Sequence, residues 1–167
     1  MIGTREHFLM RPLLRFPGYL LLGILLLGLP TRGHAQASLV LQKNDVVTFL
    51  GGTNMVHLQQ SGQLETLLVR SFAKARPRFR DLSWEADTVF RQGSVIERWR
   101  KDGFGNRDDQ LKRVGTTILF IQFGQLESMS GPAGLEPFRK SYQQLIDRVS
   151  TQARQIVLIT PTPFEKP

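Results

Sequence analysis

Residues able to do chemistry stand near the start of the chain, where a hydroxyl follows an apolar segment. Residues 46–50 are largely apolar, two glycines interrupt them, and Thr53 comes next. A hydroxyl held at the end of a strand can attack a carbonyl carbon when a base removes its proton. The same hydroxyl can belong to an ordinary turn, so the rest of the chain must decide between the two roles.

His57 is the one histidine after residue 37, and therefore the one imidazole that could serve as the base. On a helix that begins at Asn54, the side chains of Thr53 and His57 would share a face because four residues separate them. No acid is evidently placed to orient the His57 ring, as a catalytic triad requires. A surface or capping role for His57 is the simpler interpretation.

Polar and aromatic residues also follow the next two apolar segments. Trp84 and Asp87 come after the second segment, and Glu127 comes after the third. Together with Asn54, these residues could line a pocket. The plainer alternatives are that Asp87 caps a short helix and that Glu127 is a charged turn residue.

Composition argues against a metal or nucleotide cofactor. The chain has no cysteine, one histidine after residue 37 and scattered carboxylates, which do not form a zinc constellation. A phosphate loop of the GxxxxGK[ST] kind is absent. The net charge is +8, and residues 1–37 supply +3 of it through four arginines and one glutamate, which leaves +5. This mild excess is weak evidence for nucleic acid, so we expect no metal, no cofactor and no nucleic-acid partner.

One basic cluster lies in the middle of the chain. It consists of Lys74, Arg76, Arg78 and Arg80. A solvated face is the default interpretation of such a cluster, and anion binding is the alternative.

Four segments have the composition of strands and must position these residues. They are residues 46–50, 79–82, 116–123 and 155–160. The last two are near-continuous runs of β-branched, aliphatic and aromatic residues, a pattern typical of strands covered on both faces. Residues 61–75 and 133–149 place apolar side chains at helical spacing. Strands that alternate with helices predict a parallel sheet in a layered α/β domain.

Residues 91–114 are polar and charged and contain Gly103 and Gly105. We expect a long surface loop here, with a partial helix around residues 93–101. In open α/β sheets, ligands bind outside the carboxyl ends of the strands. Those ends are therefore where a functional site is expected.

Residues 1–37 have the pattern of a secretory signal peptide. Arginines precede an apolar run at residues 19–29, and small residues suitable for cleavage follow it. A membrane anchor is the alternative, although the apolar run is shorter than the ~20 residues of a span. We expect export to the periplasm or the extracellular space, one domain over residues 38–167, and no stable membrane span after processing.

Three segments taken together resemble the first three conserved blocks of the SGNH, or GDSL-like, hydrolases. They read "FLGGTN", "FRDLSWEADTVF" and "FIQFGQLES". "GPAGLEPFRKSYQQLI" is similar to the helix that follows the third block in a secreted subgroup whose first block is Gly-Gly-Thr. The resemblance covers residues 45–161, with the blocks in the family's order and spacing. It implies a flavodoxin-like three-layer α/β/α fold and hydrolysis of esters or acyl groups.

The same resemblance implies roles for individual residues. Thr53 stands where the family has its nucleophilic serine, and Ser83 stands where a backbone N–H donates to the oxyanion hole. The third block, Gly-x-Asn-Asp, corresponds to Gly124 and the residues up to Glu127. Leu126 replaces its asparagine, and loss of one such donor costs roughly 10²–10³ in turnover. The family's last block, Asp-x-x-His beyond the fourth strand, has no counterpart in the sequence.

We therefore expect a relative of these hydrolases with weak or absent activity, acting on a small-molecule ester or on an acylated or glycan substrate. One alternative is an exported, non-catalytic module that binds glycan or lipid in the same crevice. Another is a shortened gene product whose sheet is short or incomplete at the carboxyl end. The sequence leaves the oligomeric state open.

Overall fold

The computed structural model describes residues 38–90, 102–103 and 105–164. The strands are β1 (Val46–Gly51), β2 (Arg78–Asp81), β3 (Ile118–Gln122) and β4 (Gln155–Leu158). The α-helices are α1 (Thr53–Ser61), α2 (Gln63–Ser71), α4 (Arg107–Val114) and α5 (Leu135–Val149), and the 3-10 helices are η1 (Ala73–Ala75), η2 (Glu127–Ser130) and η3 (Pro132–Gly134). The expected signal peptide (residues 1–37) and the expected partial helix (residues 93–101) lie outside the described residues.

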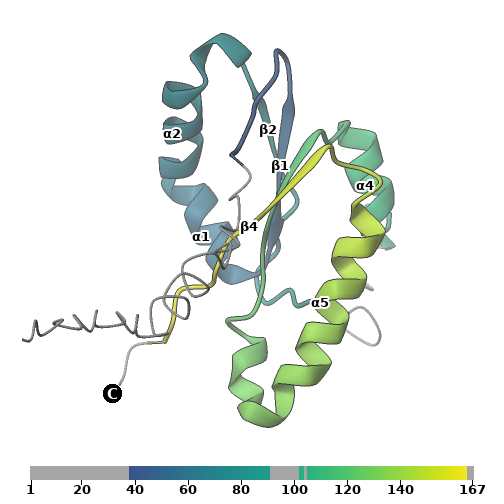
Figure 1. Cartoon of the computed structure of the whole chain (residues 1–167). Coiled ribbons are helices and arrows are strands. Elements are labelled where there is room, and N and C mark those ends of the chain that lie inside the picture. The colour runs from purple at the N-terminus through teal and green to yellow at the C-terminus, as the bar shows by residue number, and fades with distance from the viewer. Residues whose placement is uncertain (1–37, 91–101, 104, 165–167) are drawn as a thin grey trace, which may run out of the picture. The chain divides into compact units, whose positions relative to one another are not determined.

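The four strands form one parallel sheet in the order β2-β1-β3-β4 (Figure 1). Strand β1 is central and pairs with β2, where Val46 lies opposite Arg78, and with β3, where Val47 lies opposite Ile118. The first strand lies inside the sheet, the second forms one edge, and the chain then returns across β1 to build the other side. This is the strand order of the flavodoxin-like α/β fold, and it confirms the predicted fold class.

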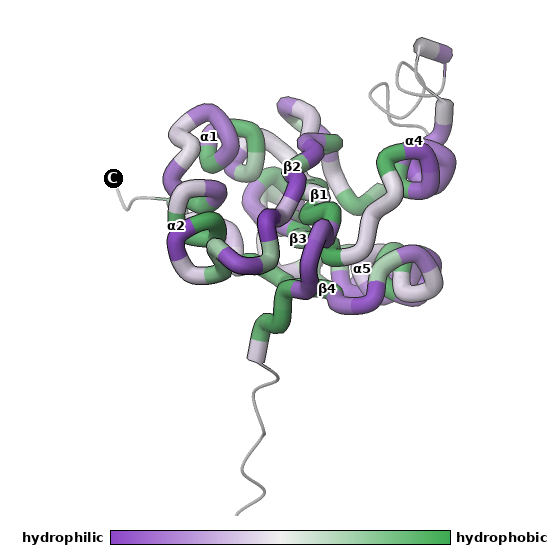
Figure 2. Tube along the Cα trace, turned by 90° about the horizontal axis from the view of Figure 1, so that it is seen from above, coloured by the Kyte–Doolittle hydropathy of each residue, from purple (hydrophilic) through white to green (hydrophobic). Residues whose placement is uncertain are grey.

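Helices cover both faces of the sheet (Figures 1 and 2). On one face, Phe49 of β1 lies in a buried cluster with Met55 of α1 and Leu68 of α2. On the other face, Leu50 lies in a second cluster with Leu111 of α4 and Leu145 of α5. Neighbouring residues of a strand point to opposite faces, so one apolar strand supplies both cores.

The helical segment predicted over residues 61–75 corresponds to α2 and η1, and α2 is separated from α1 by Gly62. Its φ of +64° is left-handed, and it ends α1 and begins α2. This conformation favours glycine because a Cβ atom would be crowded there. Helix α2 turns Leu68 into the core, as the periodicity predicts, whereas Leu67 stays 59% exposed.

The expectation of a loop through residues 91–114 is wrong over its last part, where α4 forms. The Asn106 side chain accepts a hydrogen bond from the Asp109 N–H at 3.0 Å and caps the helix. Gly115 ends it with a left-handed φ of +71°. Only Leu111 supplies a large buried apolar side chain, so hydrophobic spacing gives a weak signal for this helix.

Strand β4 also differs from its prediction. Strand β3 is buried along its whole length, but β4 is half-buried and its Leu158 is 52% exposed. The cause is position, because within the described sheet β4 has a neighbour on one side only. The opposite edge strand, β2, carries the exposed charged residues Arg78 and Arg80.

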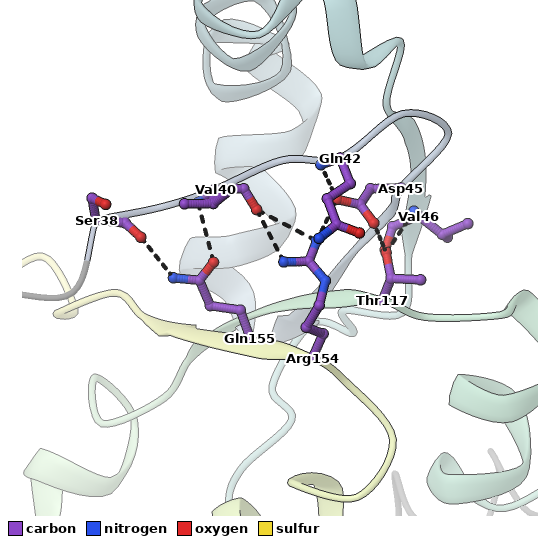
Figure 3. Close-up of polar contacts among 8 residues, drawn as sticks. All are labelled: Ser38, Val40, Gln42, Asp45, Val46, Thr117, Arg154 and Gln155. Carbon is purple, nitrogen blue, oxygen red and sulfur yellow. Dashed lines mark hydrogen bonds and ion pairs between the residues drawn. The ribbon is translucent and has the colours of Figure 1, made fainter.

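The segment before β1 is fastened to the amino ends of β3 and β4 (Figure 3). Arg154 binds the Asp45 carboxylate at 2.6 Å, and Asp45 accepts a hydrogen bond from the Thr117 hydroxyl at 2.8 Å. Gln155 exchanges hydrogen bonds with the backbone of Ser38 and Val40. These contacts hold the segment before β1 against the amino end of the sheet. None of the helices in the described ranges is both long enough and apolar enough to cross a bilayer.

Candidate functional site

A crevice of about 170 Å³ opens at the carboxyl ends of β1 and β3. It is lined by Gly52, Thr53, Asn54, Asp87, Gln122, Phe123, Gly124, Gln125, Leu126, Glu127, Met129, Pro161 and Phe164. Six of the residues singled out in the sequence therefore line the same crevice, although they come from three separate segments that follow β1, β2 and β3. These six are Thr53, Asn54, Asp87, Gly124, Leu126 and Glu127.

Thr53 is the first residue of α1 and lies where the helix meets the crevice. Its hydroxyl oxygen accepts a hydrogen bond from the Ala86 N–H at 3.0 Å, which ties α1 to the loop after β2. His57 is exposed, and among the described residues no hydrogen bond joins it to Thr53. Within the described residues, the Thr53 hydroxyl therefore contacts a backbone N–H and no base.

Ser83 and Trp84 lie apart from this crevice. They line a second hollow of about 300 Å³ with Asp81, Leu82, Gln110, Arg113 and Val114. The Ser83 N–H donates to the Asp81 carboxylate at 2.9 Å, and the Ser83 hydroxyl contacts the same oxygen. A backbone N–H that is already donated to a carboxylate is not offered to a ligand.

Gly124 lies in the crevice, but its N–H is also engaged, because it donates to the Glu127 carboxylate at 2.9 Å. Its φ of +117° favours glycine. An added Cβ would stand 3.3 Å from Cγ of Pro161. Leu126 adds a half-exposed apolar side chain in place of a donor. Two of the positions that the family resemblance assigns to an oxyanion hole, Ser83 and Gly124, thus donate their N–H groups within the chain.

Glu127 is a buried clamp between two loops. Its side chain is 6% exposed, and its carboxylate accepts hydrogen bonds from the Val89 N–H at 2.8 Å and the Gly124 N–H at 2.9 Å. The first donor belongs to the loop after β2 and the second to the loop after β3. Backbone donors satisfy the carboxylate without a cation, so Glu127 fixes the crevice wall.

Asp87 is equally buried, and its partner Arg107 was not singled out in the sequence. The Arg107 guanidinium binds both Asp87 oxygens, at 3.0 and 3.2 Å, and the two side chains are each 1% exposed. A single arginine among 22 cations carries no signal of burial. Gly52 approaches the same loop so closely that an added Cβ would lie 2.6 Å from the Asp87 carbonyl oxygen.

An apolar groove of about 640 Å³ adjoins the crevice and shares Phe123, Gly124, Glu127 and Pro161 with it. Its walls come from η3, α5 and the end of β4, including Leu135, Phe138, Tyr142 and Leu158. Leu135 and Leu158 are each more than half exposed. Burial raises the pKa of Tyr142 to about 12, and the negative charge of Glu127 adds to this.

Three buried polar atoms near the crevice and groove have no hydrogen-bond partner within the described part of the chain. They are Asn54 Nδ2, Gln122 Oε1 and the Tyr142 hydroxyl. Buried polar groups are rarely left unsatisfied, so these atoms are available to a polar group in the site. In the described ranges, no three His, Cys, Asp or Glu side chains gather in a way that could hold a metal ion.

No family model, curated protein or solved structure matches the chain.

Proposed function

We propose that the domain is a relative of the SGNH hydrolases whose crevice binds the acyl part of an ester ligand without efficient hydrolysis. The observation that carries the proposal is the junction of a small crevice, which contains a few polar side chains, with a larger apolar groove. Ligand sites are typically apolar with a few well-placed polar groups. An acyl chain suits the groove, and the carbonyl of an ester suits the Asn54 amide.

The proposed relationship to the SGNH hydrolases is supported by the position of Thr53. It begins the helix after β1 and faces the loops after β2 and β3, at the carboxyl edge of a sheet with flavodoxin-like strand order. Ligands of such sheets bind at this edge. This placement agrees with the motif order that the sequence shares with the family.

The lack of efficient hydrolysis rests on three contacts. The Thr53 hydroxyl has no base in contact with it among the described residues, and the N–H groups of Ser83 and Gly124 are donated to Asp81 and Glu127. An acyl-enzyme needs both an activated nucleophile and donors for the developing oxyanion. Since the described residues supply neither an activated nucleophile nor free N–H donors at Ser83 and Gly124, we expect the protein to bind an ester without hydrolysing it efficiently.

Ester turnover by the purified protein tests the proposal, with 4-nitrophenyl butyrate and octanoate as substrates. Wild type and Thr53→Ala should release nitrophenolate at the same rate, close to the rate in buffer. A wild-type rate ~10²-fold above that of Thr53→Ala would overturn the inactivity and make the protein an esterase. Thr66→Ala serves as the matched control, because this exposed threonine of α2 lies outside the crevice and its loss should leave the rate unchanged.

Binding is measured separately with an octanoyl amide, which resists hydrolysis, by titration calorimetry. Leu158→Glu introduces a charge into the groove and should weaken binding at least tenfold, because burying an unpaired carboxylate is costly. Leu67→Glu changes an equally exposed leucine on α2 and should not affect binding. Equal affinities for the two variants would exclude the groove as the acyl site.

A glycan ligand is the second candidate, and the hollow that contains Trp84 favours it. An indole ring there stands beside the polar side chains of Asp81, Gln110 and Arg113. Loss of oligosaccharide binding in Trp84→Ala, with octanoyl amide binding intact, would support this candidate.

A further inference from the structure

Four cations surround two shallow hollows at the amino end of the sheet, away from the crevice. Lys43, Lys74 and Arg76 line a hollow of about 490 Å³. Arg70 and Lys74 line an adjoining one of about 360 Å³, which has half-buried Leu41 and Phe72 in its wall. We call these four cations the basic rim.

The backbone under the basic rim is fixed by hydrogen bonds between two turns. The Asn44 N–H donates to the Ala75 carbonyl at 2.7 Å, and the Arg78 N–H donates to the Asp45 carbonyl at 2.8 Å. Asn44 and Arg76 both adopt left-handed φ values, +65° and +49°. The turn that carries Lys43 is therefore held against the turn that carries Lys74 and Arg76.

The basic rim lacks a counter-charge among the residues that the structure describes. None of its four cations has a carboxylate within the 4.0 Å of an ion pair. Elsewhere, the buried or half-exposed Arg107 and Arg154 each bind an aspartate directly. The carboxyl end of α2 accounts for Arg70, because a helix dipole favours a cation there. It does not account for Lys43, which precedes β1, or for Arg76, which follows η1.

Holding like charges together raises the energy of the free protein, and an anion that binds among them relieves this repulsion. A phosphate group suits the basic rim better than a single carboxylate. It carries up to two charges on several acceptor oxygens, and Arg76 can bind two of them side by side while the lysines act as point charges.

We propose that the basic rim is a binding site for a phosphate group. The group can belong to a free phosphate or phosphomonoester, or to the headgroup of an anionic phospholipid. Leu67 distinguishes these sources, because it lies three residues before Arg70 on α2 and is 59% exposed. Side chains at this spacing share a helix face, so a bilayer that meets Arg70 would also meet Leu67.

The test uses the full chain and two probes. Inorganic phosphate is titrated by calorimetry, and vesicles of phosphatidylcholine with 30% phosphatidylglycerol are compared with pure phosphatidylcholine in a sedimentation assay. Lys74→Gln/Arg76→Gln should lose about 100-fold in affinity for the probe that binds, roughly tenfold for each charge-assisted contact. The matched control is Arg139→Gln/Lys140→Gln, which removes two exposed charges from α5 and should change affinity less than twofold.

Each outcome decides one point. Binding of phosphate that is lost in the rim variant but not in the control supports a soluble ligand. Binding to the anionic vesicles that is also weakened by Leu67→Ser supports a lipid headgroup. The proposal is overturned if the wild type binds neither probe, or if the two double variants lose affinity equally. The charge-preserving variant Lys74→Arg leaves Arg76 in place and should keep binding. A loss of affinity as large as that of the double rim variant would contradict the role of charge.

Discussion

Replacing Glu127 by glutamine tests whether one carboxylate holds the crevice together. Glutamine has nearly the same shape but only one acceptor oxygen, whereas Glu127 accepts from Val89 at 2.8 Å and from Gly124 at 2.9 Å. In Glu127→Gln, the amide NH₂ must face one of these two N–H donors. That donor stays buried and unpaired, and the remaining hydrogen bond loses its charge.

The magnitude follows from these two losses. A buried donor without a partner costs ~1–3 kcal/mol, and loss of charge assistance at the other costs about 1 kcal/mol more. We expect the free energy of unfolding to fall by about 3 kcal/mol. For a domain of this size the melting temperature should drop by roughly 10 °C.

Thermal and urea unfolding followed by circular dichroism measure the effect, with Glu136→Gln as the matched control. Glu136 is exposed and makes only a surface ion pair with Arg139, so its loss should cost less than about 0.5 kcal/mol. Absorbance titration of the tyrosines gives a second readout, because removal of the Glu127 charge should lower the pKa of Tyr142 while burial keeps it above 10. Equal stability of the two variants would refute the clamp.

Three further changes have definite expected outcomes. The pKa of Tyr142 is raised from 10 to about 12 on folding, so the native state retains the phenol proton over this pH range. The free energy of unfolding should therefore fall as the pH rises from 10 to 12. In Tyr142→Phe this decline should be smaller, as measured by urea midpoints between pH 10 and pH 12. Gly52→Ala puts a Cβ atom 2.6 Å from the Asp87 carbonyl oxygen and should lower the free energy of urea unfolding by ~1–3 kcal/mol. An unchanged urea midpoint would show that the loop of Asp87 can move away without loss of stability. The hydroxyls of Thr48 and Thr116 form a buried hydrogen bond at 2.8 Å. Thr48→Val alone leaves the Thr116 hydroxyl unpaired and should lower the free energy of unfolding by ~1–3 kcal/mol, whereas Thr48→Val/Thr116→Val should recover part of this loss. Additive effects of the two single substitutions in a double-mutant cycle would contradict the pairing.

The central part of the fold could be predicted because its signals are local. Apolar runs bounded by glycine located β1 and β3, and helical spacing located α5. The same signals were weaker where a single residue decides the structure. Gly62 separates α1 from α2 by its left-handed backbone, whereas the predicted helical segment begins one residue before it. Helix α4 is fixed by its caps rather than by an apolar stripe.

The site was harder to predict because its polar contacts join distant loops. Thr53, Gly124 and Glu127 line one crevice, whereas Ser83 lines another hollow. The sequence could not show that the Ser83 and Gly124 N–H groups are donated to neighbouring carboxylates, since backbone hydrogen bonds depend on loop conformation. Nor could it pair Asp87 with Arg107, which lies 20 residues away and carries no pattern of its own.

The two edge strands of the described sheet differ in charge, and this difference has a consequence for handling the protein. Guanidinium groups on β2 repel a second chain that approaches edge-on, as natural sheets commonly do to stay monomeric. Strand β4 carries no charged residue between Gln155 and Leu158, and Leu158 lines the apolar groove. Oligomers that form at high concentration should therefore grow from the β4 side, and a lysine in place of Leu158 should keep the preparation monodisperse.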